Sequence, residues 1–588
     1  MAVDRHPEAS EGAPAAGDEP AGSPAPSAPV PARTLVSGGR SLRVCLVIGG
    51  SHIGSIEPDV DFTYVSLATQ LQEAGHDVTL LHTDAPAGSD SPDAGEPGTA
   101  VDRGIRLVRL PESPIPLSAT SAQLAVSHRV YLWLRDHDSF DFVHFAERGG
   151  CGFYAITARR QGLVLRRTTC VVGLFGASAW IRRASHDIIR IESQLECDYI
   201  EQRSAELADF AWPASDPALA WARAEGWELP DPAGARHIPG PEGWVRWHEQ
   251  LEPVELPPAR SDLPTISVCL NHYNRPHYLR QALDSLIDQD RAPDEVIVLD
   301  DGSPGEGVQE ELDRIVAEYE FDRRGWRLIR ERDLYLGASR NAAARAATCE
   351  YILVMDDDNV ARPFEVATFA EVARQTGADV ITCQLDRFES TGPPTAETIP
   401  AHRFLFAGAA LPLCAIRNTF GDANALVRRR SLLELGGYTE DRNVGHEDWE
   451  AYSRFALRGY HVEVIPEPLF YYRIAPGAMT QRVSVIRNHL RSLRPHLEQI
   501  PRPYHGLIEL SMGLLLARWG YFDPPPAAGE SDDEPAPGPM TEPPPLPLRY
   551  RIADAINDRV KALRPIHRLA KRLIQGHPDP ADTEVRAG

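Results

Sequence analysis

The stretch PTISVCLNHYNRPHYLRQALDSLIDQDRAPDEVIVLDDGS (264–303) contains an apolar run, an amphipathic segment and a second apolar run. The first run, TISVCL (265–270), has the length and composition of a buried strand. Leucines then recur at helical spacing, at Leu279, Leu283 and Leu286. Because strands that alternate with helices are typical of parallel sheets, this stretch predicts an α/β fold.

Acidic residues directly follow two of the predicted strands. Asp300 and Asp301 end the run EVIVLDDGS, and Asp356, Asp357 and Asp358 follow the run YILVM. Open parallel sheets bind ligands beyond the carboxyl ends of their strands, so both acidic turns should face one crevice. Aspartates two positions apart at a strand end can direct both carboxylates to one Mg²⁺ or Mn²⁺ ion, together with substrate phosphate oxygens. The alternative is an acidic surface turn, since Asp and Asn are common turn residues.

A third acidic feature is GHEDWE (445–450), which precedes a predicted amphipathic helix. Glu447 and Asp448 open this helix, while Trp449 and Tyr452 fall on its apolar face. These carboxylates are candidates for substrate chemistry. They are also what an ordinary helix start favours, because negative charge there complements the helix dipole.

The bulk composition limits the possible classes of protein. At 588 residues the chain exceeds the roughly 250 to 300 residues at which a single core stops growing. Its net charge of −24 argues against nucleic-acid binding, which depends on clustered Lys and Arg. The eight cysteines form no CxxC pair and suggest buried, reduced thiols. Without a long apolar run or a basic, apolar leader, we expect a cytoplasmic protein.

Strand and helix patterns divide the chain into two Rossmann-like α/β domains with flanking segments. The first begins at RVCLVIGG (43–50), and the Pro- and Gly-rich stretch LPDPAGARHIPGPEG (229–243) separates it from the second. The predicted segments are a disordered tail at 1–40, a first domain at 41–228, a linker at 229–262, a second domain at 263–500, a helical extension at 501–522, a Pro-rich linker at 523–547 and basic amphipathic helices at 548–575.

The basic helices at 548–575 are opposite in charge to the chain as a whole. Ile552, Ile556, Val560 and Leu563 share one helical face among several Arg and Lys residues. Amphipathic helices most often cover a core, so packing on the second domain is one interpretation. Contact with the anionic inner face of the plasma membrane is the other, since basic residues around an apolar face attract a helix to such lipids.

Four motifs of the second domain occur in a set order: PTISVCLNHYNRPHYLRQALDSLIDQ (264–289), EVIVLDDGS (295–303), GASRNAAARAATCEYILVMDDDN (337–359) and GHEDWE (445–450). Together they resemble family 2 of the inverting glycosyltransferases, which have the GT-A fold. The resemblance implies sugar transfer from a nucleotide diphosphate sugar to a hydroxyl of a glycan or of a lipid-linked, cell-envelope acceptor. It also implies assistance by Mn²⁺ or Mg²⁺.

The resemblance assigns roles to individual positions. It places Asp356 and Asp358 at the metal and makes Asp448 the catalytic base, flanked by the substrate-binding Glu447 and Trp449. Ala475 stands where many relatives have a His that completes the metal site, so water and diphosphate would have to complete it here. The residues implied in nucleotide binding are Tyr273, Asn274, Arg275, Asp301, Arg340, Asn341 and Asp357.

The first domain resembles the amino-terminal half of GT-B glycosyltransferases of the glycogen-synthase-like family 4. VCLVIGG (44–50), ATQLQEAGHDVTLL (68–81) and FVHFAERGGCGFYAITARRQGL (142–163) carry this resemblance. In two-domain relatives the other half holds most of the nucleotide-sugar contacts, and here the chain passes into the GT-A-like domain instead. An accessory or acceptor-binding module is therefore expected. Its Gly-Gly turns, at Gly49 and Gly149, are either acceptor-contacting loops or simple tight turns.

Two other functions remain possible at this stage. The chain could be a non-catalytic carbohydrate-binding or assembly module that retains the glycosyltransferase fold. It could also be bifunctional, although the missing nucleotide-binding half of the first domain argues against that. An active transferase would be distinguished by slow hydrolysis of nucleotide sugars in the presence of Mn²⁺.

Overall fold

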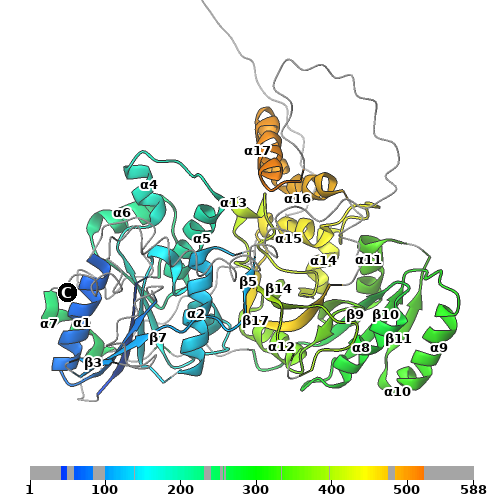
Figure 1. The fold of residues 1–588 in the computed structure, drawn as a ribbon, viewed down its shortest axis with the longest axis horizontal. Coiled ribbons are helices and arrows are strands. Elements are labelled where there is room, and N and C mark those ends of the chain that lie inside the picture. Colours follow the sequence, from blue (N-terminus) through cyan, green and yellow to red (C-terminus); the bar gives the residue numbers. More distant parts are fainter. Residues whose placement is uncertain are drawn as a thin grey trace, which may run out of the picture.

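The computed structural model of the chain describes residues 41–49, 59–83, 100–230, 240–474 and 484–521, apart from positions 103, 119, 138, 252–253, 255, 257–259, 333 and 396–397. The predicted tail at 1–40, the Pro-rich linker at 523–547, the basic helices at 548–575 and Ala475 lie outside the described residues. The fold is mixed α/β and is built on two sheets that lie side by side (Figure 1).

The first domain is built on a sheet with the order β3-β4-β2-β1-β6-β7-β8. Apart from the short antiparallel β3, its neighbouring strands run parallel, as expected for a Rossmann-like domain. Its strands are β1 (Arg43–Ile48), β2 (Asp77–His82), β3 (Ala100–Asp102), β4 (Ile105–Arg109), β6 (Phe142–Ala146), β7 (Thr169–Leu174) and β8 (Phe210–Pro213). Its helices are α1 (Asp59–Glu73), α2 (Ala122–Asp136), α3 (Phe153–Arg160), α4 (Ser178–Ala184), α5 (Glu192–Leu207) and α6 (Asp216–Ala224).

The second domain is built on a larger mixed sheet with the order β11-β10-β9-β12-β16-β14-β15-β5, to which β13 and β17 add. Its strands are β9 (Ile266–His272), β10 (Glu295–Asp300), β11 (Arg327–Arg330), β12 (Tyr351–Asp356), β13 (Val360–Ala361), β14 (Val380–Phe388), β15 (His402–Phe404), β16 (Leu426–Arg428) and β17 (Val462–Arg473). Its helices are α8 (Pro276–Ile287), α9 (Val308–Glu318), α10 (Phe321–Arg324), α11 (Leu336–Ala346), α12 (Glu365–Thr376), α13 (Leu411–Cys414), α14 (Arg429–Leu435), α15 (Glu447–Leu457), α16 (Val485–Gln499) and α17 (His505–Arg518).

The stretch predicted as a linker at 229–262 contains a helix that packs on the first sheet. This helix is α7 (Gly240–Gln250). Its Trp244 ring lies 4.7 Å from that of Trp212, centroid to centroid, and Nε2 of its His248 lies 2.8 Å from Nε2 of His144 on β6. The Pro and Gly residues at 229–243 predicted a linker, but the aromatic residues that follow them pack α7 against the first sheet.

The two domains share an interface with a continuous apolar interior. β5 (Leu117–Ser118), which lies between β4 and α2 in the chain, pairs with β15 at the edge of the second sheet. Leu405 and Ala407, which follow β15, are buried in the core of the first domain. The Tyr131 hydroxyl also donates a 2.6 Å hydrogen bond to Glu467. The first domain is therefore packed directly against the second.

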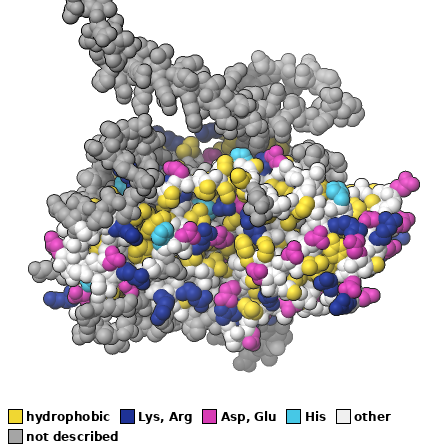
Figure 2. All heavy atoms as spheres, turned by 60° about the horizontal axis from the view of Figure 1, so that its bottom comes forward, with side chains coloured by type: hydrophobic (Ala, Val, Ile, Leu, Met, Phe, Trp, Pro, Cys, Tyr) yellow, Lys and Arg dark blue, Asp and Glu magenta, His cyan; other side chains and the backbone are white. Residues whose placement is uncertain are grey.

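The described surface is consistent with an acidic chain that carries both signs of charge. In Figure 2, acidic and basic side chains are interspersed over the face that looks downward in Figure 1. None of the described helices combines the length and apolar character that crossing a bilayer requires. The eight cysteines are free thiols, seven of them buried, in agreement with the sequence.

Candidate active site

The acidic turns predicted from the sequence meet at one edge of the second sheet. β9 lies between β10 and β12, and all three strands run parallel. Asp300 at the end of β10 is opposite His272 of β9, and Asp356 at the end of β12 is opposite Asn271. Because the three strands end at the same level, the DDGS and DDDN turns lie beside each other, as the sequence indicated.

Asp357, the middle aspartate, is fully buried and anchors the end of β9. Its carboxylate accepts hydrogen bonds from Nδ1 of His272 at 2.7 Å and from the backbone N–H of Tyr273 at 3.3 Å. Arg275 also forms an ion pair with it. The side chain therefore holds the turn after β9 in place, which leaves the Tyr273 side chain half-exposed beside the site.

Asp356 and Asp358 are more accessible, with 29% and 15% of their side-chain surface exposed. Asp358 forms an ion pair with Arg275. Burial, followed by the negative charges of Asp357 and Asp356, raises the pKa of Asp358 to about 7, against the opposing effect of Arg275. This excess of negative charge at two accessible oxygen ligands suits a hard divalent cation. The described residues contain no group of three or more His, Cys, Asp or Glu arranged to hold a metal.

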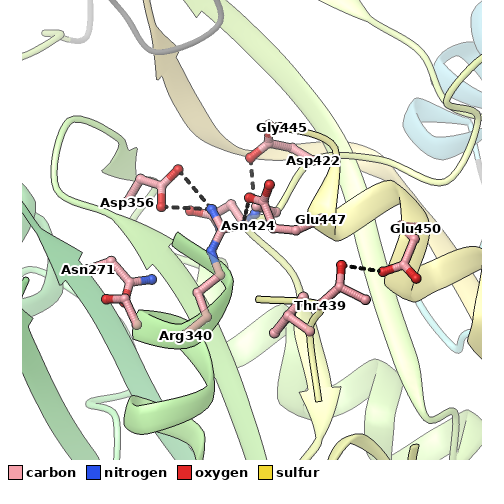
Figure 3. A network of polar contacts seen from close by, with 12 residues as sticks. Asn271, Arg340, Asp356, Asp422, Asn424, Thr439, Gly445, Glu447 and Glu450 are labelled. Carbon is pink, nitrogen blue, oxygen red and sulfur yellow. Dashed lines mark hydrogen bonds and ion pairs between the residues drawn. The ribbon is translucent and has the colours of Figure 1, made fainter. Parts of the chain in front are cut away.

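Arg340 of α11 links this strand end to the GHEDWE motif. Its guanidinium is buried and donates to Asp356 at 3.1 Å on one side and forms an ion pair with Glu447 on the other (Figure 3). Glu447 also lies 3.6 Å from Arg491 of α16. Two motifs that are about 90 residues apart in the sequence are thus held together by one buried cation.

Asp448 is the second residue of α15, and its side chain is only partly buried. Burial raises its pKa to about 6, and the neighbouring charge of Glu447 acts in the same direction, while Arg340 opposes it. A carboxylate with a pKa just below neutral is both ionised and appreciably basic at pH 7. Such a carboxylate could accept a proton from a substrate hydroxyl, so Asp448 stays a candidate for the general base.

Asp422 belongs to this site, although the sequence reasoning missed it. Figure 3 shows it in the loop near Glu447. Burial and then the charges of Asp448 and Asp356 raise its pKa to about 7. Its position in the sequence could have indicated this. GDAN (421–424) comes just before β16, which runs antiparallel to β12, so β16 starts near the edge where β12 ends. An acidic turn before an antiparallel strand reaches the same edge of a sheet as an acidic turn after a parallel strand.

The predicted nucleotide-binding residues are partly occupied with organising loops. Asp301 accepts hydrogen bonds from the backbone N–H groups of Leu334 and Tyr335 just before α11. Asn341 is buried and exchanges hydrogen bonds with the backbone of Tyr438. The backbone N–H of Asn274 donates to Ser303 at 2.7 Å, which ties the turns after β9 and β10 together. Their contacts with a nucleotide stay predictions.

Trp449, predicted to bind substrate, lies in the core of the second domain. Only 3% of its surface is exposed, and its indole N–H donates a 2.7 Å hydrogen bond to the carbonyl of Cys414. The adjacent His446 has a positive φ of 64°, as has Tyr335 at 74°. A positive φ is uncommon for these residues, and such backbone strain tends to gather at functional sites.

Comparisons with known proteins agree with the geometry. Residues 267–436 match the family model described as glycosyl transferase family 2. The uncharacterized glycosyltransferase MJ1057 of Methanocaldococcus jannaschii is 25% identical over 216 residues, which cover 36% of this chain and 72% of that protein. The succinoglycan biosynthesis protein ExoO of Rhizobium meliloti is 29% identical over 233 residues, or 38% of this chain and 65% of ExoO.

A similar solved structure is S. aureus TarS 1-349 in complex with UDP-GlcNAc, at 17% identity and a TM-score of 0.34, covering 43% of this chain and 73% of that one. The family match falls on the domain that carries the acidic edge. Residues 267–436 therefore form a domain that matches glycosyl transferase family 2.

Proposed function

We propose that the second domain transfers a sugar from a nucleotide diphosphate sugar to an acceptor hydroxyl in one inverting displacement, with Asp448 as the general base. The observation that supports this most directly is the Arg340 bridge, which joins Asp356 to Glu447. This bridge holds the end of β12, where a diphosphate would bind, beside the start of α15, where the acceptor proton would be taken. A single displacement needs both groups on opposite sides of one sugar carbon.

Asp448 takes the proton from the acceptor hydroxyl as that oxygen attacks the anomeric carbon. Its pKa of about 6 leaves it largely ionised at neutral pH and more basic than an ordinary aspartate. Glu447 is engaged by Arg340 and lies 3.6 Å from Arg491, so it is the less available of the two carboxylates. We assign it to orienting the start of α15 and contacting substrate.

Asp356 and Asp358 would hold a divalent metal ion, Mn²⁺ or Mg²⁺, together with diphosphate oxygens and water. Bound there, the ion would stabilise the negative charge of the leaving diphosphate. Arg275 now forms ion pairs with Asp357 and Asp358. Tyr273, Asn274, Arg275, Asp301, Arg340, Asn341 and Asp357 surround the same edge and form the proposed nucleotide site.

A glycan or lipid-linked acceptor and a peripheral position at the inner face of the plasma membrane complete the proposal. An apolar face of α17 supports the membrane contact. Leu507, Leu510 and Leu514 lie on one side of this helix and are 56–60% exposed. The segment predicted to form basic amphipathic helices follows α17 in the chain, so both could meet a bilayer surface together.

Donor hydrolysis tests the proposal without knowledge of the acceptor. The protein, supplied with Mn²⁺ and a panel of nucleotide sugars, should release free sugar slowly from one of them, and the same donor should raise the melting temperature because it binds only the folded state. Stabilisation by a donor without hydrolysis or transfer would favour a non-catalytic sugar-nucleotide binding module instead.

A further inference from the structure

A cavity of about 520 Å³ lies between α16 and the loop that leads into the GHEDWE motif, and its lining includes none of the strand-end aspartates. Four arginines line it, together with one acidic residue, Asp441, and three aliphatic side chains. The arginines are Arg442, Arg487, Arg491 and Arg494. In a chain with a net charge of −24, this concentration of positive charge marks a specialised surface.

Two carboxylates lie beside the arginines of α16, Asp441 in the lining and Glu447 behind it, 3.6 Å from Arg491. Asp441 lies 3.1 Å from Arg494 and 3.5 Å from Arg491, so its charge is shared between two of them. The buried Arg491 also donates to the carbonyls of Val444 at 2.8 Å and Asp441 at 2.9 Å, which fixes one wall of the cavity. Within the described residues, the exposed Arg487 guanidinium has no carboxylate partner. The exposed Arg487 can therefore offer its charge to a ligand, beside a wall that Arg491 holds in place.

The cavity is connected to the proposed catalytic base through one short loop. The residues that line it at 441–444 precede Glu447 and Asp448, and Arg491 lies 3.6 Å from Glu447. In Figure 1, α16 lies above α15, whose first turn carries Asp448. A molecule held in the cavity would be next to the acceptor side of the site. The donor diphosphate, in contrast, is assigned to Asp356, Asp358 and Arg275.

We propose that this cavity is a subsite for a phosphate group of the acceptor. The inference rests on the proposed transferase function and specifies its acceptor as a phosphate-bearing molecule. Arginine presents several N–H donors in a planar fork that matches phosphate oxygens, and these charge-assisted hydrogen bonds are strong. Leu490 and Leu497 form an aliphatic wall beside the arginines, which suits a phosphate attached to an organic chain.

Binding of inorganic phosphate tests the cavity directly. Phosphate is titrated into the full-length protein in EDTA, so that no metal ion assists the donor site. Arg487→Ala should raise the Kd for phosphate about tenfold, the effect of losing one charged hydrogen-bonding partner. The matched control is Arg323→Ala on α10, an arginine that is 79% exposed and distant in sequence from the cavity. Asp358→Ala, at the donor site, should leave this affinity unchanged.

Vesicles identify the source of the phosphate. If Arg487→Ala weakens sedimentation with phosphatidylglycerol vesicles but not with phosphatidylcholine vesicles, the cavity binds lipid phosphate at a membrane. If it weakens only the binding of inorganic phosphate, the subsite serves a phosphate-bearing acceptor in solution. Equal phosphate and vesicle binding by the wild type, Arg487→Ala and Arg323→Ala would overturn the proposal.

Donor hydrolysis tests the transferase function separately from the phosphate subsite. Arg487 touches neither Asp448 nor the strand-end aspartates in any described contact, so donor hydrolysis by water should be the same in Arg487→Ala and the wild type. A wild type that does not hydrolyse any donor contradicts the transferase function, and phosphate titration then still decides whether the cavity binds anions.

Discussion

Both sheets place carboxylates at the carboxyl ends of their strands, and the two domains use them differently. In the first domain, Glu147 after β6 accepts hydrogen bonds from the backbone N–H groups of Phe175 at 2.8 Å and Gly176 at 2.5 Å. Glu201 of α5 accepts one from Gly149 at 2.7 Å. These buried acids fasten loops to one another.

In the second domain, Asp357 likewise holds a loop in place, whereas Asp358 and Asp448 are partly exposed. Asp448 and Asp358 have raised pKa values of about 6 and 7, and neighbouring carboxylates contribute to both shifts. The pKa of Glu147 is also raised to about 7, mainly by burial. A raised pKa therefore does not identify the catalytic centre by itself. The difference is that Asp358 and Asp448 remain partly accessible to a substrate or a cation, whereas Glu147 is buried.

Asp448→Asn gives the largest expected effect and tests the catalytic side of this contrast. Transfer should fall at least about a hundredfold, since a positioned general base is lost. Donor binding and the melting temperature should change little because the amide has nearly the same shape. Initial rates and a thermal melt measure the two effects. Full activity would remove Asp448 from the mechanism.

Asp358→Ala tests whether the accessible acids at the end of β12 act through a cation. Affinity for the nucleotide diphosphate in Mn²⁺ should fall by about tenfold or more, and affinity for the bare nucleoside should fall less. Loss of a carboxylate ligand removes charge and geometry that the ion requires. Calorimetry with and without Mn²⁺ measures the difference, and an unchanged metal requirement would place the ion elsewhere.

The pH dependence of transfer should report the raised pKa of Asp448. Below about pH 6 the carboxylate binds a proton and cannot accept another, so kcat/KM should fall, approaching tenfold for each further pH unit. Above that pH the base is ionised and this loss is absent. A rate that is constant from pH 7 down to pH 4.5 would show that Asp448 does not titrate in the reaction.

Glu147→Gln is the matched substitution in the first domain, because it makes the same change from acid to amide at another raised pKa. We expect the stability of the protein at neutral pH to fall by about 1–3 kcal/mol, since one buried oxygen acceptor is replaced by an N–H donor facing a backbone N–H. Transfer per folded molecule should be unchanged. Denaturant unfolding and initial rates measure both, and a rate loss as large as that of Asp448→Asn would assign chemistry to the first domain.

The smallest effect concerns the chain after α17. The intact protein should sediment with anionic vesicles at low salt more than a chain ending at Phe522 does, because the basic helices predicted at 548–575 are then missing. Raising the salt should reduce the difference, as screening weakens attraction to the lipid surface. Equal sedimentation of both chains would leave packing on the protein as the role of that segment.

Motif position alone predicted the α/β character of both domains and the meeting of the DDGS and DDDN turns. Parallel strands in one sheet end at one edge, so a residue at a strand end can be placed without knowing any side-chain contact. Asp422 was not predicted, because its turn precedes a strand that runs in the opposite direction. The prediction also placed Trp449 at the substrate, whereas the indole is buried against Cys414.

The sequence by itself determined the strand–helix repeats, the acidic strand ends and the helix that starts with Glu447 and Asp448, because these depend on local periodicity and on residues close in the chain. Only the tertiary structure decided that Arg340 joins Asp356 to Glu447 and that Leu405 and Ala407 complete the core of the first domain. It alone also brought four arginines around one cavity. Such contacts join residues from separate elements, and their partners depend on how whole helices and sheets pack, which local sequence patterns do not encode.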